Sequence, residues 1–107
     1  MLTGTHVAVE DPRNQDILIY INGELLPRKD AKISVFDSGY LVGDGIWEAV
    51  RLYNGTLVFI DQHLDRLYSA AKSIALDLKL TKQEVIDEIN KTLQANNMST
   101  DVHVQLS

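Results

Sequence analysis

The sequence predicts an α+β fold, an antiparallel meander sheet with two helices packed on it. Two Asn-Gly pairs, at 22–23 and 54–55, each separate apolar runs. This is the strongest short-range signal for a β-hairpin, because both turn residues need positive φ. Further along, apolar residues recur at helical spacing in two stretches. Because the strands come mostly before the helices instead of alternating with them, an antiparallel sheet is favoured over a parallel one.

Chain length and the weak patterning of the first residues set the expected domain limits. A chain of 107 residues forms one domain with a modest core. Residues 1–16 contain Pro12 and little to bury, so we expect an amino-terminal extension that is partly ordered at best. The domain proper is expected at 17–107.

A meander accounts for the next part of the chain. Branched apolar and aromatic residues in DILIYI predict a strand. Asn22-Gly23 then turns the chain into a second strand, which Pro27 ends or marks as a sheet edge. The strands expected here occupy residues 16–21, 24–26 and 31–36.

Turn residues on either side of Tyr40 lead into the central strand, expected at 46–53. Alternation gives this strand two sets of side chains. Because neither set is purely polar, we expect both faces of the strand to be covered. The glycines at 43 and 45 are explained by turn geometry and not by a phosphate loop, since no Lys and Ser/Thr follow them. The two sets are Ile46, Glu48, Val50 and Leu52, and Trp47, Ala49, Arg51 and Tyr53.

Two helices and a last strand complete the predicted fold. The first helix is expected at 61–78, with Asp61 as its N-cap. The second begins at Thr81, because Thr81 and Glu84 have the spacing of a capping box, and it stops near Asn96. Residues 101–107 alternate apolar and polar side chains and predict a strand.

Three ordered stretches of the chain resemble a known family. SVFDSGYLVGDGIWEAVRLYNG followed by FIDQHLDRLYSAAKSI is similar to the amino-terminal domain of class IV (fold-type IV) pyridoxal-phosphate aminotransferases. The upstream IYINGELLPRKDAKIS and the downstream NNMSTDVHVQLS also resemble the family. Its members include D-amino acid and branched-chain aminotransferases, R-selective amine transaminases and aminodeoxychorismate lyase. The resemblance implies the small domain of such an enzyme.

The resemblance also implies a reaction and a cofactor. A transaminase with pyridoxal 5'-phosphate moves an amino group from an amino acid or amine donor to a 2-oxo acid acceptor. In the family, the lysine that bonds to the cofactor and shuttles the substrate proton lies in a larger carboxyl-terminal domain, and no lysine here matches it. We therefore expect this chain to be part of a longer polypeptide, with no catalytic residue and no activity of its own. Family members are homodimers, so a homodimer is implied.

Arg66 is the residue that the resemblance places on the cofactor. His63, Arg66 and Leu67 match the family's H-x-x-R-L word, whose arginine holds the cofactor phosphate. A guanidinium suits this role because its planar fork binds phosphate oxygens in pairs and stays charged near neutral pH. From the helix pattern alone, Arg66 would instead be interpreted as a solvent-exposed helix arginine.

Five more residues match family positions that line the substrate pocket. Trp47 stands where relatives usually have Phe or Tyr, so its larger ring should narrow the pocket. Val42 occupies a position that is often aromatic in relatives, and its smaller side chain should return some of that room. Arg51 is expected to pair with a substrate carboxylate if it faces the site. From the residues alone, ordinary sheet packing would explain Trp47 and Arg51. The five residues are Val42, Trp47, Ala49, Arg51 and His103.

Composition excludes several other classes of function. A net charge of −5 argues against nucleic acid or an anionic membrane as the main partner. The absence of cysteine excludes disulfides and thiolate metal sites. His6, His63 and His103 lack the spacing of a metal site, so we expect no metal. No apolar run has the length of a membrane span and no signal pattern begins the chain, and cytoplasmic residence fits.

Two questions about function stay open at this point. The strand VHVQLS resembles the corresponding strand of D-amino acid aminotransferases more than that of branched-chain enzymes, and this favours D-amino acids as donors. Within it, His103 stands where the D-amino acid enzymes commonly have Tyr. A lyase of the same fold, similar to aminodeoxychorismate lyase, is the near alternative to a transaminase. A domain that binds a ligand or partner without catalysis is the alternative from another class. An absorbance band of a lysine-bound aldimine would support the enzyme, and its absence with excess cofactor would favour the binding domain.

Overall fold

The computed structural model describes residues 10–107, which divide into two compact units. The first unit ends at Lys32 and the second is Ile33–Ser107. Of the extension expected at 1–16, residues 1–9 lie outside the described part, and Pro12–Asn14 form a short 3-10 helix, η1.

The described part of the first unit is built on a β-hairpin. Strand β1 (Leu18–Ile21) pairs antiparallel with β2 (Glu24–Pro27). Asn22 and Gly23 between them have φ of 51° and 88°, which confirms the first Asn-Gly turn. Pro27 is the last residue of β2, and a second 3-10 helix, η2 (Arg28–Asp30), follows it directly.

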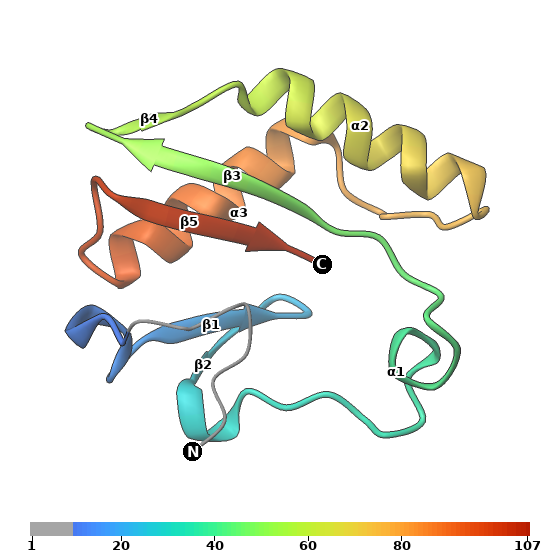
Figure 1. The fold of residues 1–107 in the computed structure, drawn as a ribbon, viewed down its shortest axis with the longest axis horizontal. Coiled ribbons are helices and arrows are strands. Elements are labelled where there is room, and N and C mark those ends of the chain that lie inside the picture. The colour runs from blue at the N-terminus through green and yellow to red at the C-terminus, as the bar shows by residue number, and fades with distance from the viewer. Residues whose placement is uncertain (1–9) are drawn as a thin grey trace, which may run out of the picture. The chain divides into compact units, whose positions relative to one another are not determined.

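The second unit contains a three-stranded antiparallel sheet with strand order β4-β3-β5. The central strand is β3 (Glu48–Tyr53), flanked by β4 (Thr56–Leu57) and β5 (Val102–Leu106) (Figure 1). Asn54 and Gly55 have φ of 47° and 78°, so the second hairpin is also confirmed. The α+β class is confirmed, while the expected single meander divides into a two-stranded and a three-stranded sheet.

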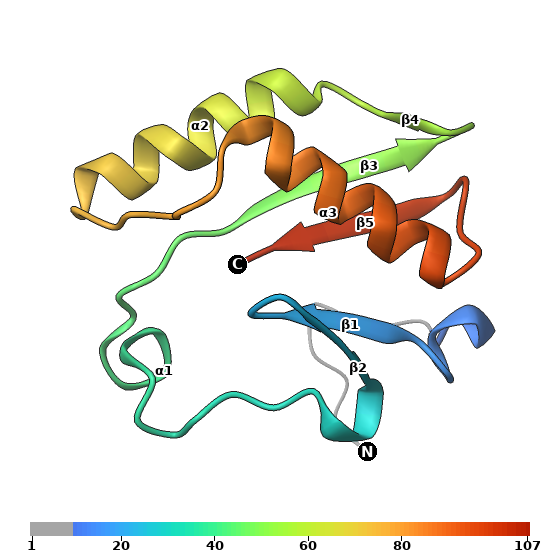
Figure 2. The ribbon, with the colours of Figure 1, turned by 180° about the vertical axis from the view of Figure 1, so that it is seen from behind.

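Two helices of the second unit cover one side of this sheet. Helix α3 (Lys82–Ala95) lies behind the sheet in Figure 1 and in front of it in Figure 2, and α2 (Ile60–Ser73) runs beside β3. Leu64 of α2 is fully buried, which stabilises the fold by about 1.5–3 kcal/mol. No helix in residues 10–107 has the length and apolar character needed to cross a membrane. The buried apolar residues are Val50, Leu52, Leu64, Leu67, Ala71, Ile89 and Leu93.

Alternation along β3 separates a buried face from an open one. Val50 and Leu52 are 0% and 3% exposed, and they face the helices. On the opposite face Arg51 and Tyr53 are exposed, and Ala49 is half-buried. The expectation that both faces are covered is therefore wrong for the described residues, because both long helices pack on the same side.

The long helices begin with different caps. Phe59, not Asp61, is the N-cap of α2; its backbone is left-handed (φ 54°) and its side chain makes no capping bond. Asp61 lies in the first turn, where its negative charge interacts favourably with the positive end of the helix dipole. The capping box of α3 is confirmed: the Thr81 hydroxyl accepts from the Glu84 amide at 3.1 Å, and the Glu84 carboxylate accepts from the Thr81 amide at 3.0 Å.

Helix α2 ends earlier than its apolar pattern predicts. The pattern indicates a helix at 61–78, but α2 stops at Ser73. Ala75 has a φ of 55°, and the amide of Leu76 donates to the carbonyl of Ala71 at 2.8 Å. These bonds close a Schellman motif, which usually has glycine in the left-handed position. Because alanine occupies it here, the sequence gives no stop signal.

The segment between the two sheets forms no strand. The return strand expected at 31–36 is wrong: no described strand pairs with these residues, and most of their side chains are exposed. The expected turn after Phe36 is instead a short helix, α1 (Ser38–Val42). Asp37 caps it by accepting a hydrogen bond from the Gly39 amide at 2.8 Å, and Gly43 ends it with a φ of 68°.

Candidate functional site

Arg66 of α2 forms a two-bond ion pair with Glu48 of β3. Nε of Arg66 donates to Oε2 of Glu48 at 2.9 Å, and Nη2 donates to Oε1 of the same carboxylate. Two parallel N–H···O bonds fix the plane of a guanidinium as well as its position. The Arg66 side chain is nevertheless 70% exposed. Arg66 is therefore open to solvent but held in one orientation by the strand.

Glu48 is the buried acid of the described chain. It is 5% exposed and shares its face of β3 with Val50 and Leu52. Nδ1 of His63 lies 2.7 Å from Oε1 of Glu48. Hydrogen bonds from Arg66 and then from His63 lower the pKa of Glu48 to about 2. The carboxylate is thus ionised and can only accept, so Nδ1 of His63 carries the proton in this bond.

Core packing places the two basic side chains over the start of β3. Leu64 and Leu67 are 0% and 6% exposed, and their burial sets the rotation of α2 about its axis. His63 and Arg66 are three residues apart, so they lie side by side on the helix surface. The same hydrogen bond that lowers the pKa of Glu48 raises the pKa of Arg66, so the guanidinium stays charged.

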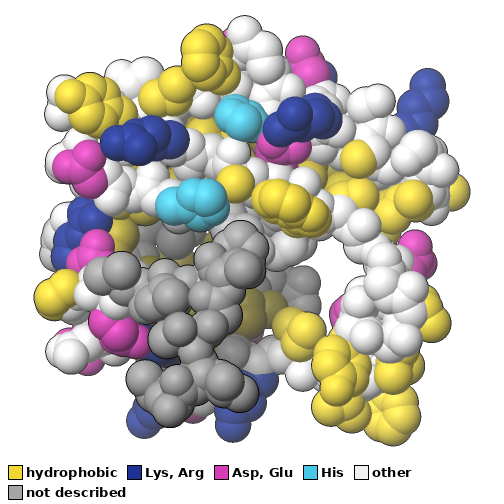
Figure 3. Space-filling model, in the orientation of Figure 1, with side chains coloured by type: hydrophobic (Ala, Val, Ile, Leu, Met, Phe, Trp, Pro, Cys, Tyr) yellow, Lys and Arg dark blue, Asp and Glu magenta, His cyan; other side chains and the backbone are white. Residues whose placement is uncertain are grey.

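The open face of the sheet holds three of the expected pocket residues. Arg51 and His103 are cross-strand partners in the β3–β5 register, and Ala49 lies two residues before Arg51 on the same face. The Arg51 guanidinium lies 3.7 Å from Asp101 and 5.7 Å from the centre of the Tyr53 ring. In this view of the molecule, histidine, basic and acidic side chains lie near one another beside apolar ones (Figure 3).

Trp47 and Val42 lie outside the strand. Trp47 comes directly before β3 and is 69% exposed. Val42 is 75% exposed on α1, which Figure 1 shows away from the sheet. The described structure therefore brings Ala49, Arg51 and His103 together on one face of the sheet and does not bring Val42 to them. Their assignment to a substrate pocket stays a prediction.

Glu48 is the site residue that the sequence analysis missed. The available signal was one acid in the alternating set Ile46, Glu48, Val50 and Leu52, whose other members are apolar. A carboxylate on a core-facing strand position needs partners, because a buried unpaired charge is costly. That rule predicts basic side chains from a covering element.

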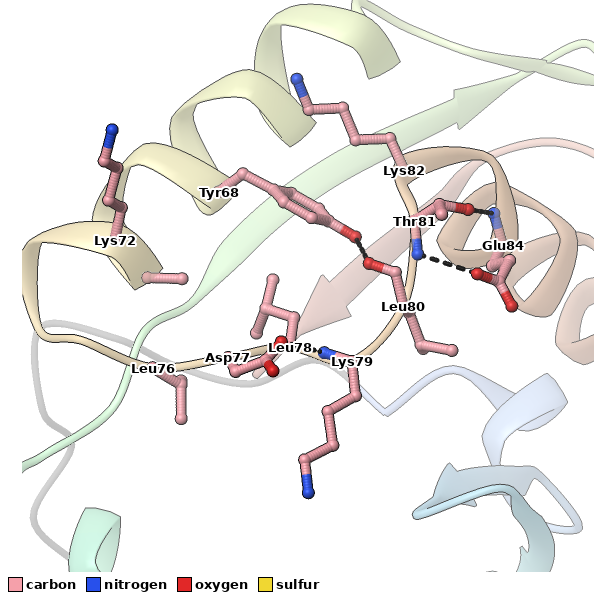
Figure 4. A pocket seen from close by; sticks show the side chains of 11 residues that line it. Tyr68, Lys72, Leu76, Asp77, Leu78, Lys79, Leu80, Thr81, Lys82 and Glu84 are labelled. Carbon is pink, nitrogen blue, oxygen red and sulfur yellow. Dashed lines mark hydrogen bonds between the residues drawn. The ribbon is translucent and has the colours of Figure 1, made fainter.

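A shallow hollow at the α2–α3 connection lies apart from these residues. It is lined by residues between Tyr68 and Glu84, with Lys72 and Lys79 at its rim (Figure 4). The Tyr68 hydroxyl donates to the Leu80 carbonyl, which fixes the connecting loop on the helix. None of Glu48, His63 or Arg66 lines it. Of its polar side chains, Asp77 bonds within the loop, and Thr81 and Glu84 form the α3 cap.

Among residues 10–107, no group of three or more His, Asp or Glu side chains has an arrangement suited to a metal ion. His63 bonds to Glu48, and His103 lies on the open face of β5. His6 lies outside the described residues.

Sequence comparisons identify the chain's relatives. The family model described as amino-transferase class IV matches residues 45–107. A branched-chain-amino-acid aminotransferase of Methanocaldococcus jannaschii is 48% identical over 82% of this chain. D-alanine aminotransferase of Staphylococcus haemolyticus is 41% identical over 75% of it. The chain spans only 30% and 28% of the length of these two relatives.

Structure comparisons find the same fold in solved aminotransferases. A branched-chain aminotransferase from Thermoproteus uzoniensis, crystallised with norvaline, superposes with a TM-score of 0.75 at 27% identity, over 83% of this chain and 31% of that one. The branched-chain amino acid aminotransferase from T.th., complexed with N-(5'-phosphopyridoxyl)-L-glutamate, has a TM-score of 0.75 at 22% identity, over 84% of this chain and 31% of that one. The second likeness, at this identity, is one of fold.

Proposed function

The chain belongs to the class IV aminotransferase family, and we propose that it forms the amino-terminal small domain of a pyridoxal-phosphate-dependent transaminase. The complete enzyme moves an amino group between an amino acid or amine and a 2-oxo acid. The observation that carries this proposal is the Arg66 guanidinium, charged and exposed but oriented by Glu48. It lies within the residues that match the family model.

Arg66 fits the phosphate of pyridoxal 5'-phosphate. Its Nε and one Nη2 proton bond to Glu48, so the opposite edge of the guanidinium is available to an anion. A guanidinium binds phosphate oxygens in pairs and keeps its charge at any working pH. When bound, pyridoxal phosphate supplies an electron sink that stabilises a substrate carbanion. Arg66 holds the phosphate end, and the lysine that bonds to the cofactor lies in a further domain of the enzyme.

The open face of β3 forms part of the substrate pocket in this proposal. Ala49 leaves room between two large side chains, the indole of Trp47 and the guanidinium of Arg51. Arg51 pairs with the substrate carboxylate, because its pair with Asp101 is exposed and long and therefore easily exchanged. His103 lies across from Arg51 and completes this wall. Val42 is assigned to the pocket by its match to a family position, since the described structure does not bring it to the other three residues.

We propose D-amino acids as donors, with branched-chain amino acids as the alternative. The strand VHVQLS supports the first, and relatives at 48% and 41% identity include one enzyme of each kind. The complete enzyme acts as a homodimer in the cytoplasm. A panel of D-amino acids, L-amino acids and R-amines, each with a 2-oxo acid acceptor, assigns the donor.

One pair of assays tests the proposal. The complete enzyme with pyridoxal phosphate should convert donor and 2-oxo acid into new amino acid and new 2-oxo acid, while the isolated 107 residues should not. Turnover by the isolated chain would contradict the proposal that the lysine needed for catalysis lies in a further domain. Release of product without consumption of the 2-oxo acid would indicate a lyase instead. Failure of the complete enzyme to bind the cofactor would favour a non-catalytic binding domain.

A further inference from the structure

Glu48 is a charged group on a face of β3 whose other strand positions are apolar. It is 5% exposed, and the next two positions on its face, Val50 and Leu52, are buried. An ionised carboxylate in such a place destabilises a fold unless it is paired and hydrogen-bonded. An apolar residue would stabilise this part of the core at least as well. The presence of an acid therefore calls for an explanation beyond stability.

The two bonds of Glu48 to Arg66 use one particular edge of the guanidinium. Oε2 accepts from Nε, and Oε1 accepts from Nη2. A guanidinium has five N–H groups, so three remain: both on Nη1 and the second on Nη2. Within residues 10–107 these three make no hydrogen bond. One N–H of Nη1 and the second N–H of Nη2 form the other two-pronged edge of Arg66. The side chain that carries this edge is 70% exposed.

His63 completes the arrangement from the same helix. Its Nδ1 donates to Oε1 of Glu48 at 2.7 Å, the oxygen that also accepts from Nη2 of Arg66. The His63 side chain is 24% exposed, so it is more shielded from solvent than that of Arg66. Glu48 therefore holds two α2 side chains at once, and rotation of the Arg66 side chain breaks bonds at a buried acceptor.

We propose that Glu48 is a positioning residue for the cofactor phosphate, holding the Nε–Nη2 edge of Arg66 so that the Nη1–Nη2 edge faces the phosphate. This inference rests on the proposed function, in which Arg66 binds pyridoxal phosphate. Glu48 does not touch the phosphate and acts only through Arg66. By ordering Arg66 in advance, Glu48 reduces the conformational entropy that the Arg66 side chain loses when the phosphate binds.

Electrostatic repulsion and positioning predict opposite effects of Glu48→Gln on the affinity for the phosphate. Glu48 carries a negative charge close to where the phosphate binds, so Coulomb's law alone predicts that Glu48→Gln tightens binding of the phosphate. If Glu48 acts by orienting Arg66, Glu48→Gln weakens binding instead, because the glutamine amide offers one acceptor and one donor where the fork needs two acceptors. The sign of the change therefore separates the two effects.

The test compares pyridoxal phosphate with pyridoxal, which lacks the phosphate, in the complete enzyme. Dissociation constants are measured by absorbance titration for the parent enzyme and for Glu48→Gln, Arg66→Ala and the double variant. We expect Glu48→Gln to raise the dissociation constant of pyridoxal phosphate by about tenfold and that of pyridoxal by less than about twofold. The double variant should bind pyridoxal phosphate no more weakly than Arg66→Ala, because Glu48 acts through Arg66.

Asp65→Asn is the matched control. Asp65 is the neighbour of Arg66 on α2 and pairs with Lys82 at 2.6 Å, but it is 66% exposed and makes no described bond to Arg66. The substitution removes one negative charge, as Glu48→Gln does, from the residue next to Arg66 in the sequence without disturbing the fork. We expect both dissociation constants to stay within about twofold of the parent values.

Each other outcome has a defined meaning. Unchanged or tighter binding of pyridoxal phosphate by Glu48→Gln overturns the positioning role while the proposed function stands. Equal weakening of both ligands, in Glu48→Gln and in the charge-retaining Glu48→Asp, assigns Glu48 to folding alone and also overturns it. A parent enzyme that does not prefer pyridoxal phosphate to pyridoxal, or an Arg66→Ala variant that keeps the preference, overturns the proposed phosphate site and the inference together.

Discussion

Two arginine–carboxylate pairs lie on opposite sides of β3, and their arginines are almost equally exposed. The Arg66 side chain is 70% exposed and that of Arg51 is 66% exposed. Their acids differ: Glu48 is 5% exposed and accepts two bonds, whereas Asp101 is 64% exposed and lies 3.7 Å from Arg51. The burial of the acid, not that of the arginine, therefore decides which guanidinium is held in place.

This difference suits the two pairs to different tasks. A buried carboxylate must keep its partners, so Arg66 has one stable orientation, which in the proposed function it presents to the cofactor phosphate. An exposed pair contributes only about 0–1 kcal/mol and exchanges easily with other anions. In the proposed function, Arg51 is thus suited to a substrate that binds and leaves in each turnover.

The largest expected effect comes from removing the oriented arginine. Arg66→Ala in the complete enzyme should raise the dissociation constant of pyridoxal phosphate by at least about 100-fold, since two charge-assisted hydrogen bonds to the phosphate are lost. Absorbance titration measures the dissociation constant, and Arg51→Ala is the matched control with unchanged cofactor affinity. If the two variants weaken the cofactor equally, the contrast between the pairs does not hold.

Arg51→Ala should act on the substrate instead. We expect the KM for an amino acid donor to rise by about tenfold, because a charged partner of the substrate carboxylate is lost. Steady-state kinetics with a D-amino acid and with a branched-chain amino acid measures the change. An R-amine without a carboxylate is the internal control and should show little change in KM. A rise in KM for the amine as large as that for the amino acid would count against this role.

The buried pair should make stability depend on acid pH. The pKa of Glu48 is about 2 in the folded chain and 4.5 in its ordinary state, so the unfolded chain takes up the proton first. Stability from this group is therefore full above about pH 4.5 and is lost as the pH falls toward 2. Urea unfolding of the parent and of Glu48→Gln across this range measures the loss. The parent should lose more stability than the variant, and parallel curves would contradict the buried pair.

The smallest expected effect belongs to the exposed acid. Asp101→Asn should change the free energy of unfolding by no more than about 0.5 kcal/mol, because an exposed ion pair is screened by water and salt. Urea unfolding at neutral pH measures it. A loss of more than about 2 kcal/mol would show that this pair is structural and would remove the contrast with Glu48.

Local signals were sufficient wherever the chemistry is local. Both Asn-Gly turns and the Thr81 capping box formed as predicted, because each depends on a few neighbouring residues. The end of α2 could not be predicted, because alanine adopts the left-handed position that glycine usually marks. The strand expected at 31–36 failed for a different reason: a strand needs a partner, and no described segment pairs with it.

The candidate site was predicted only in part, because its key contact joins residues far apart in the chain. The resemblance led to Arg66, but the contact that orients Arg66 spans from residue 48 to residue 66. Nothing within α2 indicates it. The lone acid among the apolar positions of β3 was the visible signal, and its partner could be identified only once the strand and the helix were packed together.

A crystal structure of the complete enzyme with bound pyridoxal phosphate tests the central claim most directly. We predict that Nη1 of Arg66 lies within hydrogen-bond distance, about 3 Å, of a phosphate oxygen while Nε still donates to Glu48. An Arg66 side chain directed into solvent, with the phosphate held elsewhere, would contradict the account.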